Sequence, residues 1–154
     1  MMGSKSDLPF AERIGSYLTG EGFSLKCEYS VASAHRTPDY LIRKIEEYER
    51  SGDYLVYITI AGLSDALSGV VAGSTRHPVI ACPPDSEKFG WPKIFSSVMT
   101  PTGVPVLFCS KPENAALAAI RILALADPSL HEEIEKYTRV KRGEVIKADE
   151  DIER

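Results

Sequence analysis

The sequence is poor in cysteine and contains no long apolar run. Its 154 residues include three cysteines, Cys27, Cys82 and Cys109, which lie far apart and form no Cys-x-x-Cys pair. A disulfide framework or a zinc site is therefore not expected, and we interpret the cysteines as small buried apolar residues in a reducing compartment. No stretch approaches the ~20 apolar residues of a membrane span, and no signal peptide opens the chain. We expect a cytoplasmic protein without membrane contact.

The chain also lacks a surplus of positive charge and the common nucleotide-binding motifs. The net charge of −4 leaves no surplus of Lys and Arg for a nucleic-acid backbone. Without a Walker A motif or a Gly-x-Gly-x-x-Gly motif, neither ATP use nor a dinucleotide cofactor is indicated. Because no group of His and carboxylate residues has the spacing of metal ligands, we expect neither a metal nor any other cofactor. The 44% of apolar and 26% of charged residues are ordinary for a globular protein.

Helical and strand-like segments alternate along the chain. Apolar periodicity and capping residues predict helices over 8–18, 37–52, 65–74, 94–99 and 114–126, and a charged helix from about 129. Alternating or unbroken apolar runs predict strands over 23–31, 54–60, 79–82 and 104–109, with a surface loop over 83–92. The helix over 114–126, with Asn114 as its cap, is apolar almost all round, so another subunit is expected to cover it.

This alternation predicts an α/β fold with a parallel sheet between two layers of helices, formed by residues 1–154 as a single domain. One strand is missing from the pattern. The turn at Gly3 and Ser4 has the character of a strand-to-helix connection, yet only Met1 and Met2 precede it. A doubly wound sheet would need about five more apolar residues there. We expect one of two explanations. Either the reading frame begins further upstream, or the two strands beside the missing one are left unpaired and the protein is marginally folded.

Ligands of open parallel sheets bind beyond the carboxyl ends of the strands, and three polar loops are expected at that edge. The first is Gly3 to Asp7, which runs into a helix. Its glycine, hydroxyls and helix N-terminal N–H groups suit an anion such as phosphate, and Asp7 could accept hydrogen bonds from ribose hydroxyls. The alternative is an ordinary helix cap formed by Asp7.

The second loop, Ser33 to Pro38, also runs into a helix. Arg36 could hold a phosphate through two parallel hydrogen bonds, and the imidazole of His35 could transfer a proton at cellular pH. The third loop, Ala61 to Gly69, follows the most buried strand, where Gly62 permits a ligand to approach the backbone. His77 and His131 lack such neighbours, so we interpret both as surface or packing residues.

Together these loops resemble the PurE family, the phosphoribosylaminoimidazole carboxylases and carboxyaminoimidazole ribonucleotide mutases. The family's Met-Gly-Ser-x-Ser-Asp turn is matched by Met2 to Asp7, and its Ser-Ala-His-Arg-Thr-Pro motif by Ser33 to Pro38. Ala61-Gly62, the Pro-x-Gly-Val-Pro-Val run at 101–106 and the Asn-Ala-Ala-Leu run at 114–117 follow in the family's order. The resemblance extends to about Ala126.

The resemblance implies a flavodoxin-like fold, a homo-octamer and a role for each loop. His35 would be the catalytic proton shuttle. The substrate-binding residues would be Ser4, Ser6 and Arg36 at the 5′-phosphate, beside Gly3; Asp7 at the ribose; and Ser33, Ala34 and Gly62 at the base.

The third loop indicates which branch of the family the chain resembles. The mutases have Ala-Ala-His-Leu-Pro-Gly there, whereas this chain has Ser64-Asp65-Ala66-Leu67-Ser68-Gly69, similar to the animal-type branch that uses CO₂ directly. We therefore expect a lyase that carboxylates C4 of 5-aminoimidazole ribonucleotide in purine biosynthesis, with Ser64, Ser68 and the backbone of Ala66 and Leu67 around CO₂.

Three other functions remain open at this point. The chain could be the mutase, which moves a carboxylate from the exocyclic nitrogen to C4, or a carboxylase of another heteroaromatic nucleotide. It could also be a non-catalytic module that binds a nucleotide phosphate. An intact His35 beside Arg36 argues against the module, which would need only the phosphate-binding residues.

Overall fold

A parallel sheet of three strands lies at the centre of the fold. The computed structural model describes residues 1–84 and 90–152. The strands β1 (Tyr57–Thr59), β2 (Val79–Ala81) and β3 (Leu107–Phe108) lie side by side in the order β1-β2-β3. Tyr57 pairs with Val79 and Ile80 pairs with Leu107, both in parallel register. All three residues of β2 are buried, as expected of a strand covered on both faces.

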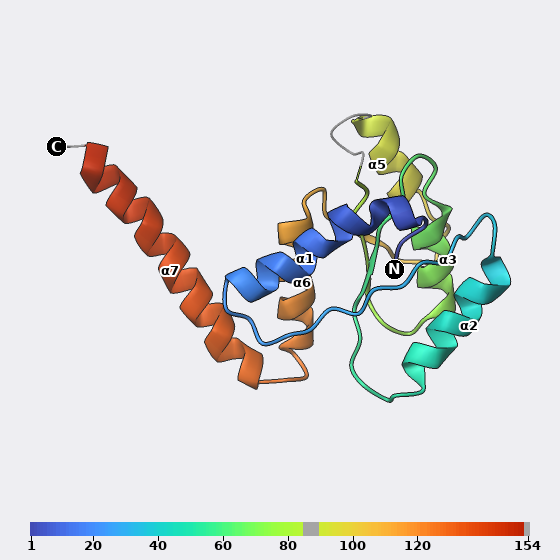
Figure 1. Ribbon diagram of the computed structural model, residues 1–154, viewed down its shortest axis with the longest axis horizontal. Coiled ribbons are helices and arrows are strands. Elements are labelled where there is room, and N and C mark those ends of the chain that lie inside the picture. The colour runs from blue at the N-terminus through green and yellow to red at the C-terminus, as the bar shows by residue number, and fades with distance from the viewer. Residues whose placement is uncertain (85–89, 153–154) are drawn as a thin grey trace.

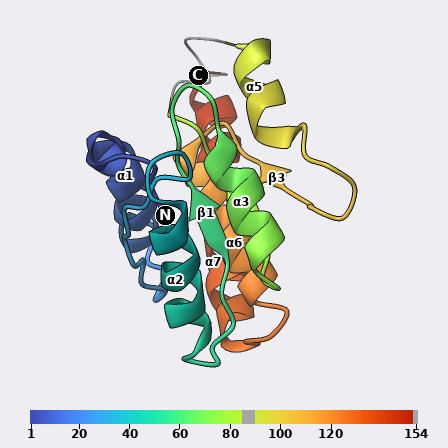
Figure 2. The same ribbon diagram turned by 90° about the vertical axis from the view of Figure 1, so that its right-hand side faces the viewer.

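Two layers of helices cover the sheet. The helices α1 (Leu8–Gly20) and α6 (Pro112–Leu123) pack together on one face, and α2 (Pro38–Glu49) and α3 (Ala66–Ser74) pack on the other. Figure 2 shows the strands between the α2–α3 pair and α6. Each helix buries an apolar stripe in the core on its own side, which is the physical basis of a three-layer fold. The predicted flavodoxin-like α/β fold is confirmed.

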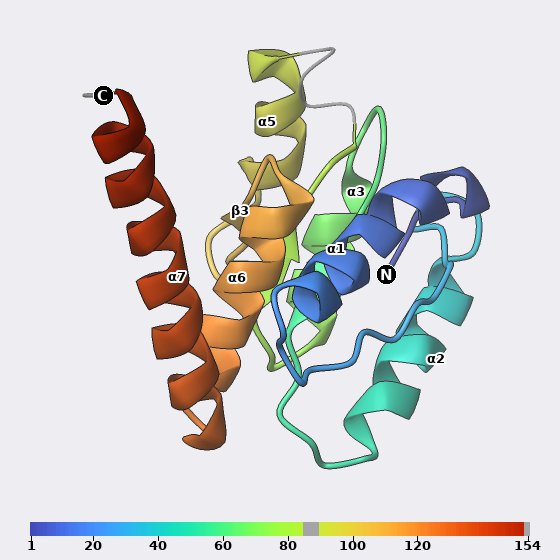
Figure 3. The same ribbon diagram turned by 60° about the vertical axis from the view of Figure 1, so that its left-hand side comes forward.

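The remaining helices extend this arrangement. A 3₁₀ turn, η1 (Lys5–Asp7), leads into α1, and α5 (Trp91–Val98) packs against α3. The helix α7 (Ser129–Ile152) begins where the charged C-terminal helix was predicted. Its first half is held by Tyr137, whose hydroxyl lies 2.6 Å from that of Tyr17, and by Lys141, whose ammonium lies 3.0 Å from Glu21. Beyond this point α7 projects away from the body of the protein (Figures 1 and 3).

Several predicted boundaries are wrong for identifiable reasons. The helix predicted to begin at Asn114 begins at Pro112, with Lys111 in the cap position, because proline needs no N–H partner in the first turn. The loop predicted over 83–92 falls partly on residues 85–89, outside the described residues, and its end already belongs to α5 at Trp91. The strands predicted over 54–60 and 104–109 are shortened to Tyr57–Thr59 and Leu107–Phe108.

The strand predicted over 23–31 is also wrong as a regular strand. Of its residues only Val31 forms a β-bridge, with Met2. A strand exists only where a neighbour accepts and donates its backbone hydrogen bonds, and the neighbour here is three residues long. The Met2 N–H donates to Ser30 O at 2.7 Å and Ala32 N–H donates to Met2 O at 2.9 Å.

The same short segment pairs with the strand on its other side. Gly3 N–H donates to Ile60 O and Ile60 N–H donates to Met1 O, both at 2.9 Å. Residues 1–3 therefore lie between residues 23–31 and β1 and pair with both.

The cysteines fit their predicted interpretation as apolar residues. All three are free, with Cys82 buried and Cys27 and Cys109 half-buried. Burial raises the pKa of each thiol, to about 12 for Cys82. Among the described residues, no helix is both long and apolar enough to cross a lipid bilayer.

The buried N-terminal ammonium predicts a pH-dependent stability. Burial lowers the pKa of the Met1 ammonium from 8.0 to about 6, an effect that the nearby Cys27 partly offsets. Because the unfolded chain binds this proton more tightly, the stabilisation is complete above pH 8 and is lost as the pH falls through 6. We expect the free energy of unfolding to fall by about 2 kcal/mol across this range.

Urea unfolding at a series of pH values measures this change, and the N-acetylated chain is the control because acetylation removes the titrating group. The histidines contribute equally to both samples. An identical pH dependence with and without the acetyl group would contradict the prediction.

Candidate functional site

The three predicted loops begin side by side at the carboxyl edge of the sheet. Met2 bridges both Val31 and Ile60, so the segments that follow these three residues leave the sheet together. A Cβ atom at Gly3 would lie 3.6 Å from the Cβ of Ala61, an ordinary contact distance. The first and third loops are therefore in close contact.

The first loop forms a closed turn with its hydroxyls outward. Ser4 caps η1: its hydroxyl accepts from Ser6 N–H at 3.3 Å and from the Ser6 hydroxyl at 2.9 Å. The Asp7 carboxylate accepts from Ser4 N–H at 3.2 Å, which completes the reciprocal capping pattern. Asp7 also occupies the cap position of α1, as predicted, but its side chain makes no capping hydrogen bond to that helix.

The second loop is closed by Ser33 and Thr37. The Thr37 hydroxyl accepts from Ser33 N–H at 3.0 Å, Thr37 N–H donates to Ser33 O at 2.9 Å, and the Ser33 hydroxyl accepts from Arg36 N–H at 3.2 Å. These bonds hold the backbone and leave the side chains of His35 and Arg36 exposed. Within the part of the chain that the structure describes, the His35 imidazole makes no hydrogen bond and Arg36 has no carboxylate partner. Both are available to a ligand.

The third loop contains a buried carboxylate. Asp65 is 5% exposed and caps α3: one oxygen accepts from Ser68 N–H at 3.0 Å. Its other oxygen accepts from the hydroxyls of Ser68 at 2.6 Å and Ser97 at 2.7 Å. The Ser68 hydroxyl also lies 2.7 Å from that of Thr59 on β1. A charged group this deep is tolerated because three donors replace its water.

The helix α5 holds the loop from the outside. Asp65 N–H donates to the Ser96 hydroxyl at 2.7 Å, and the Lys93 ammonium donates to Leu63 O at 2.6 Å. Lys93 is only 3% exposed. Leu63 itself has φ 57°, a left-handed conformation unusual for a residue with a side chain, and its side chain is exposed. These contacts from α5 hold the strained backbone in place.

Sequence reasoning missed Lys93, Ser96 and Ser97 as supports of the site. They lie on a helix whose start was placed at Ile94, and none belongs to a recognised motif. The available signal was a lysine and a pair of serines within the eight residues of a short helix otherwise rich in apolar side chains.

The structure places the predicted binding residues at two depths. Ser6, His35, Arg36 and Ser64 are exposed, whereas Leu67 is 2% and Ser68 0% exposed. Leu67 packs in the core with helix α2, and the Ser68 hydroxyl is engaged by Asp65 and Thr59. A direct contact between that hydroxyl and a ligand would require this network to rearrange.

The other predicted residues lie between these depths, half-buried along the loops: Gly3, Ser4, Asp7, Ser33, Ala34, Gly62 and Ala66. Among residues 1–84 and 90–152, no three His, Cys, Asp or Glu side chains are grouped so as to hold a metal ion.

Known proteins with similar sequences share one enzyme family. A phosphoribosylaminoimidazole carboxylase of Archaeoglobus fulgidus is 44% identical over 152 residues, which cover 99% of this chain and 82% of that protein. An N5-carboxyaminoimidazole ribonucleotide mutase of Methanocaldococcus jannaschii is 40% identical over 154 residues, covering 99% of this chain and 94% of that protein.

A similar fold is found in a solved structure of the same family. The crystal structure of Treponema denticola PurE superimposes with a TM-score of 0.89 at 38% identity, covering 99% of this chain and 96% of that one. The family model described as AIR carboxylase matches residues 1–144. With this match over most of its length, the chain belongs to the AIR carboxylase, or PurE, family.

Proposed function

We propose that this PurE-family enzyme of purine biosynthesis carboxylates C4 of 5-aminoimidazole ribonucleotide with CO₂, forming 4-carboxy-5-aminoimidazole ribonucleotide. The observation that carries the proposal is the pair formed by His35 and Arg36. Both side chains are exposed on a rigid turn beside the first and third loops, and neither is used by the described part of the protein itself. A proton acceptor adjacent to an anion-binding group suits a phosphorylated substrate that must lose a proton.

The first and second loops would hold the ribose phosphate. The Ser4 and Ser6 hydroxyls and the Arg36 guanidinium would bind the 5′-phosphate, and the Asp7 carboxylate would accept from the ribose hydroxyls. Gly3 leaves room for the backbone to approach the ligand. The base would lie against Ser33, Ala34 and Gly62, on the side that faces the third loop.

The ring would then be carboxylated in two steps. The aminoimidazole is an enamine, so C4 attacks the carbon of CO₂ without a metal or an organic cofactor. One C=O electron pair moves to oxygen, and the new C4–C bond carries a carboxylate. His35 accepts the C4 proton, which restores the aromatic ring, and general-base catalysis of this kind is worth about 10²–10⁴-fold in rate.

Charge that develops on the CO₂ oxygens would be stabilised by the N-terminus of α3 and the Ser64 hydroxyl. The first turn of a helix has N–H groups without intrahelical partners, and those of Ala66 and Leu67 begin this helix. The Ser68 hydroxyl would contribute through Asp65, by holding this turn in place.

The second candidate is the mutase reaction, and a specific observation supports it: the M. jannaschii relative with that name is 40% identical. The third loop favours CO₂, because Ala66 stands where the mutase pattern has histidine and Ser68 where it has proline. Purified enzyme should therefore convert aminoimidazole ribonucleotide at a rate that rises with bicarbonate, followed by the ultraviolet absorbance of the product.

The same assay separates the alternatives. Turnover of the N-carboxylated nucleotide faster than its spontaneous decarboxylation, with no dependence on bicarbonate, would assign the chain to the mutases. No turnover of either substrate, with the nucleotide still bound, would indicate a binding module. Turnover only of a different heteroaromatic nucleotide would reassign the base.

We also propose that the chain works as one domain in the cytoplasm and assembles as a homo-octamer. Apolar side chains remain exposed just after α6 and along the projecting half of α7, with Leu125 84%, Val145 71% and Ile146 58% exposed. We propose that a second copy of the chain covers these exposed side chains, since apolar groups are unfavourable in water.

Replacement of His35 should separate chemistry from binding. In His35→Asn the proton acceptor is lost while few ground-state contacts change, so kcat should fall by at least ~10² and the nucleotide Kd should stay within a few-fold. Steady-state kinetics and equilibrium binding measure the two quantities. The matched variant Arg36→Ala should mainly raise KM, because a phosphate contact stabilises ground and transition states alike. Weaker binding in His35→Asn with kcat unchanged would contradict the role of His35.

Removal of the Asp65 carboxylate should destabilise the protein. In Asp65→Ala the Ser68 N–H and two buried hydroxyls lose their acceptor, which should lower the free energy of unfolding by about 2–4 kcal/mol. Urea unfolding measures the loss. The control Asp39→Ala removes a side chain whose carboxylate is 76% exposed and pairs with the exposed Arg43, so its cost should stay below about 0.5 kcal/mol. Equal costs for both variants would show that the network does not support the loop.

Charges placed on the exposed apolar surface should disrupt the assembly. Light scattering should find an oligomer of the unmodified chain and smaller species of the double variant Leu125→Glu/Ile146→Glu, because both side chains are exposed in the single chain and their replacement leaves its core intact. Lys136→Glu, at an exposed polar position of α7, should leave the oligomer unchanged. A stable monomer of the unmodified chain would refute the proposal.

A further inference from the structure

A lysine is buried against the third loop. Lys93 lies on α5 and is only 3% exposed, although a lysine side chain normally stays at the surface because its charge is strongly hydrated. Among its contacts, the ammonium donates to Leu63 O at 2.6 Å, a short distance typical of a charged donor. An apolar side chain of similar length would fill the same space without burying a charge. Packing alone therefore does not explain why this residue is a lysine.

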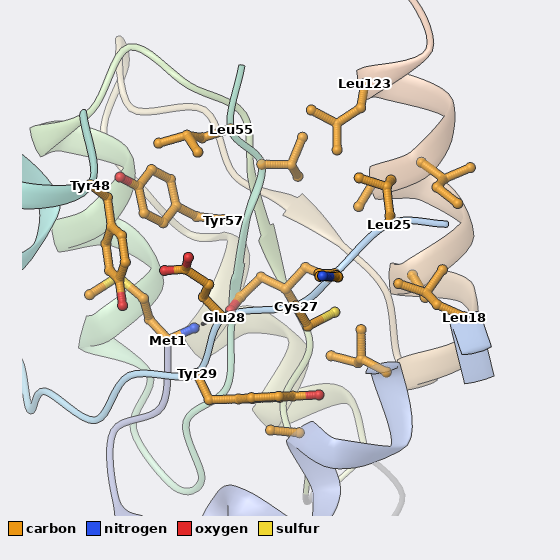
Figure 4. Close-up of a pocket in the computed structure, with 18 of the residues that line it drawn as sticks. Met1, Leu18, Leu25, Cys27, Glu28, Tyr29, Tyr48, Leu55, Tyr57 and Leu123 are labelled. Carbon is orange, nitrogen blue, oxygen red and sulfur yellow. Dashed lines mark hydrogen bonds between the residues drawn. The ribbon is translucent and has the colours of Figure 1, made fainter. Parts of the chain in front are cut away.

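The apolar cavity beside Met1 does not account for this lysine either. The cavity has a volume of about 350 Å³ and lies between the segments 25–29 and 54–58 (Figure 4). Among the described residues, none that lines the cavity belongs to α5 or to the third loop. Lys93 is therefore buried against the candidate site and not against this cavity.

The bond to Lys93 fixes the direction of the Leu63–Ser64 peptide. In this trans peptide the C=O and N–H groups point in opposite directions, so Ser64 N–H points away from α5. The third loop lies between α5 and the start of α1 (Figures 2 and 3), which places this N–H on the side of the first loop. Ser64 is exposed, and its N–H makes no hydrogen bond to any of the residues 1–84 and 90–152.

A charged donor at one end of a peptide strengthens the donor at its other end. The ammonium draws electron density toward Leu63 O, and the resonance of the peptide passes part of this effect to the Ser64 nitrogen, so that its N–H becomes more positive. The same bond holds Leu63 at φ 57°, which a residue with a side chain rarely adopts. Lys93 thereby both orients and strengthens one backbone donor of the third loop.

We propose that Lys93 is a positioning residue for the carboxylation and that Ser64 N–H is the donor that it positions. When C4 attacks CO₂, a C=O electron pair moves to oxygen, and Ser64 N–H donates to that oxygen as its charge develops. Lys93 transfers no proton and acts through the Leu63–Ser64 peptide. This inference rests on the proposed function and adds to it a group that distinguishes the carboxylated from the uncarboxylated nucleotide.

Binding of the two nucleotides to a Lys93 variant tests this role. The His35→Asn background slows the chemistry, so rapid-mixing titration gives the Kd of 5-aminoimidazole ribonucleotide and of its 4-carboxylate before either is converted. In Lys93→Met the Kd of the carboxylated nucleotide should rise about 10-fold and that of the uncarboxylated nucleotide should stay within about two-fold, because only the former has the carboxylate that Ser64 N–H contacts. With His35 intact, Lys93→Met should lower kcat by about 10–100-fold.

Further variants separate the charge of Lys93 from its packing. Lys93→Arg keeps a cationic donor but is bulkier, so it should retain more of the preference for the carboxylated nucleotide than Lys93→Met does, whereas a packing role would favour methionine. Should Lys93→Met not fold, Lys93→Gln keeps a neutral donor and should show a smaller change of the same kind.

The matched control is Lys44→Met on α2. This lysine bonds to Glu47 at 2.9 Å and makes no contact with the third loop in the described chain. Its replacement should therefore leave kcat and both Kd values within about two-fold.

The role of Lys93 would be refuted by equal changes in the two Kd values, by no change in either, or by a stronger preference for the carboxylated nucleotide in Lys93→Met than in Lys93→Arg. The unmodified chain distinguishes these results from failure of the proposed function. If that chain shows no bicarbonate-dependent turnover, both proposals are wrong, whereas normal turnover together with any of the three results above refutes the role of Lys93 alone.

Discussion

The backbone hydrogen bonds of Met2 hold the site together. Met2 bridges Val31 and Ile60, and these bridges are the pairing that connects residues 23–31 to the sheet in the described chain. The loops that follow Met2, Val31 and Ile60 carry all the candidate site residues. The position of His35 relative to the first and third loops therefore depends on a segment of three residues. The Met2 side chain, which is 2% exposed and packs with α1 and α6, helps to hold this segment in place.

The loops differ in how firmly the protein holds them, and the difference matches their proposed roles. The third loop is held by a buried carboxylate, two serines of α5 and a buried lysine, so the N-terminus of α3 is fixed before any ligand arrives. A fixed set of N–H donors is what stabilisation of a developing charge requires. In the second loop only the backbone is held, and the side chains of His35 and Arg36 stay free for the substrate.

Helices were predicted more accurately than strands, and the reason is physical. The helix α2 begins at Pro38 and buries Leu41 and Ile45, as local spacing and its start signal indicated, because a helix makes its hydrogen bonds within its own segment. The run 23–31 has an equally clear alternation but remains outside a regular ladder, since its partner is elsewhere in the chain and is too short. The predicted start of α6 at Asn114 is a smaller error, since the helix begins half a turn earlier, at Pro112.

By itself, the sequence determined the layered α/β fold, the three loops and the family. Each of these depends on local pattern or on motif order. Only the tertiary structure decided the depth of the candidate residues, with Ser64 exposed and Leu67 and Ser68 buried within the same short loop. It alone identified Lys93, Ser96 and Ser97 as supports of that loop and placed an apolar cavity beside Met1. Such features arise from contacts between segments distant in sequence, which a local sequence pattern does not reveal.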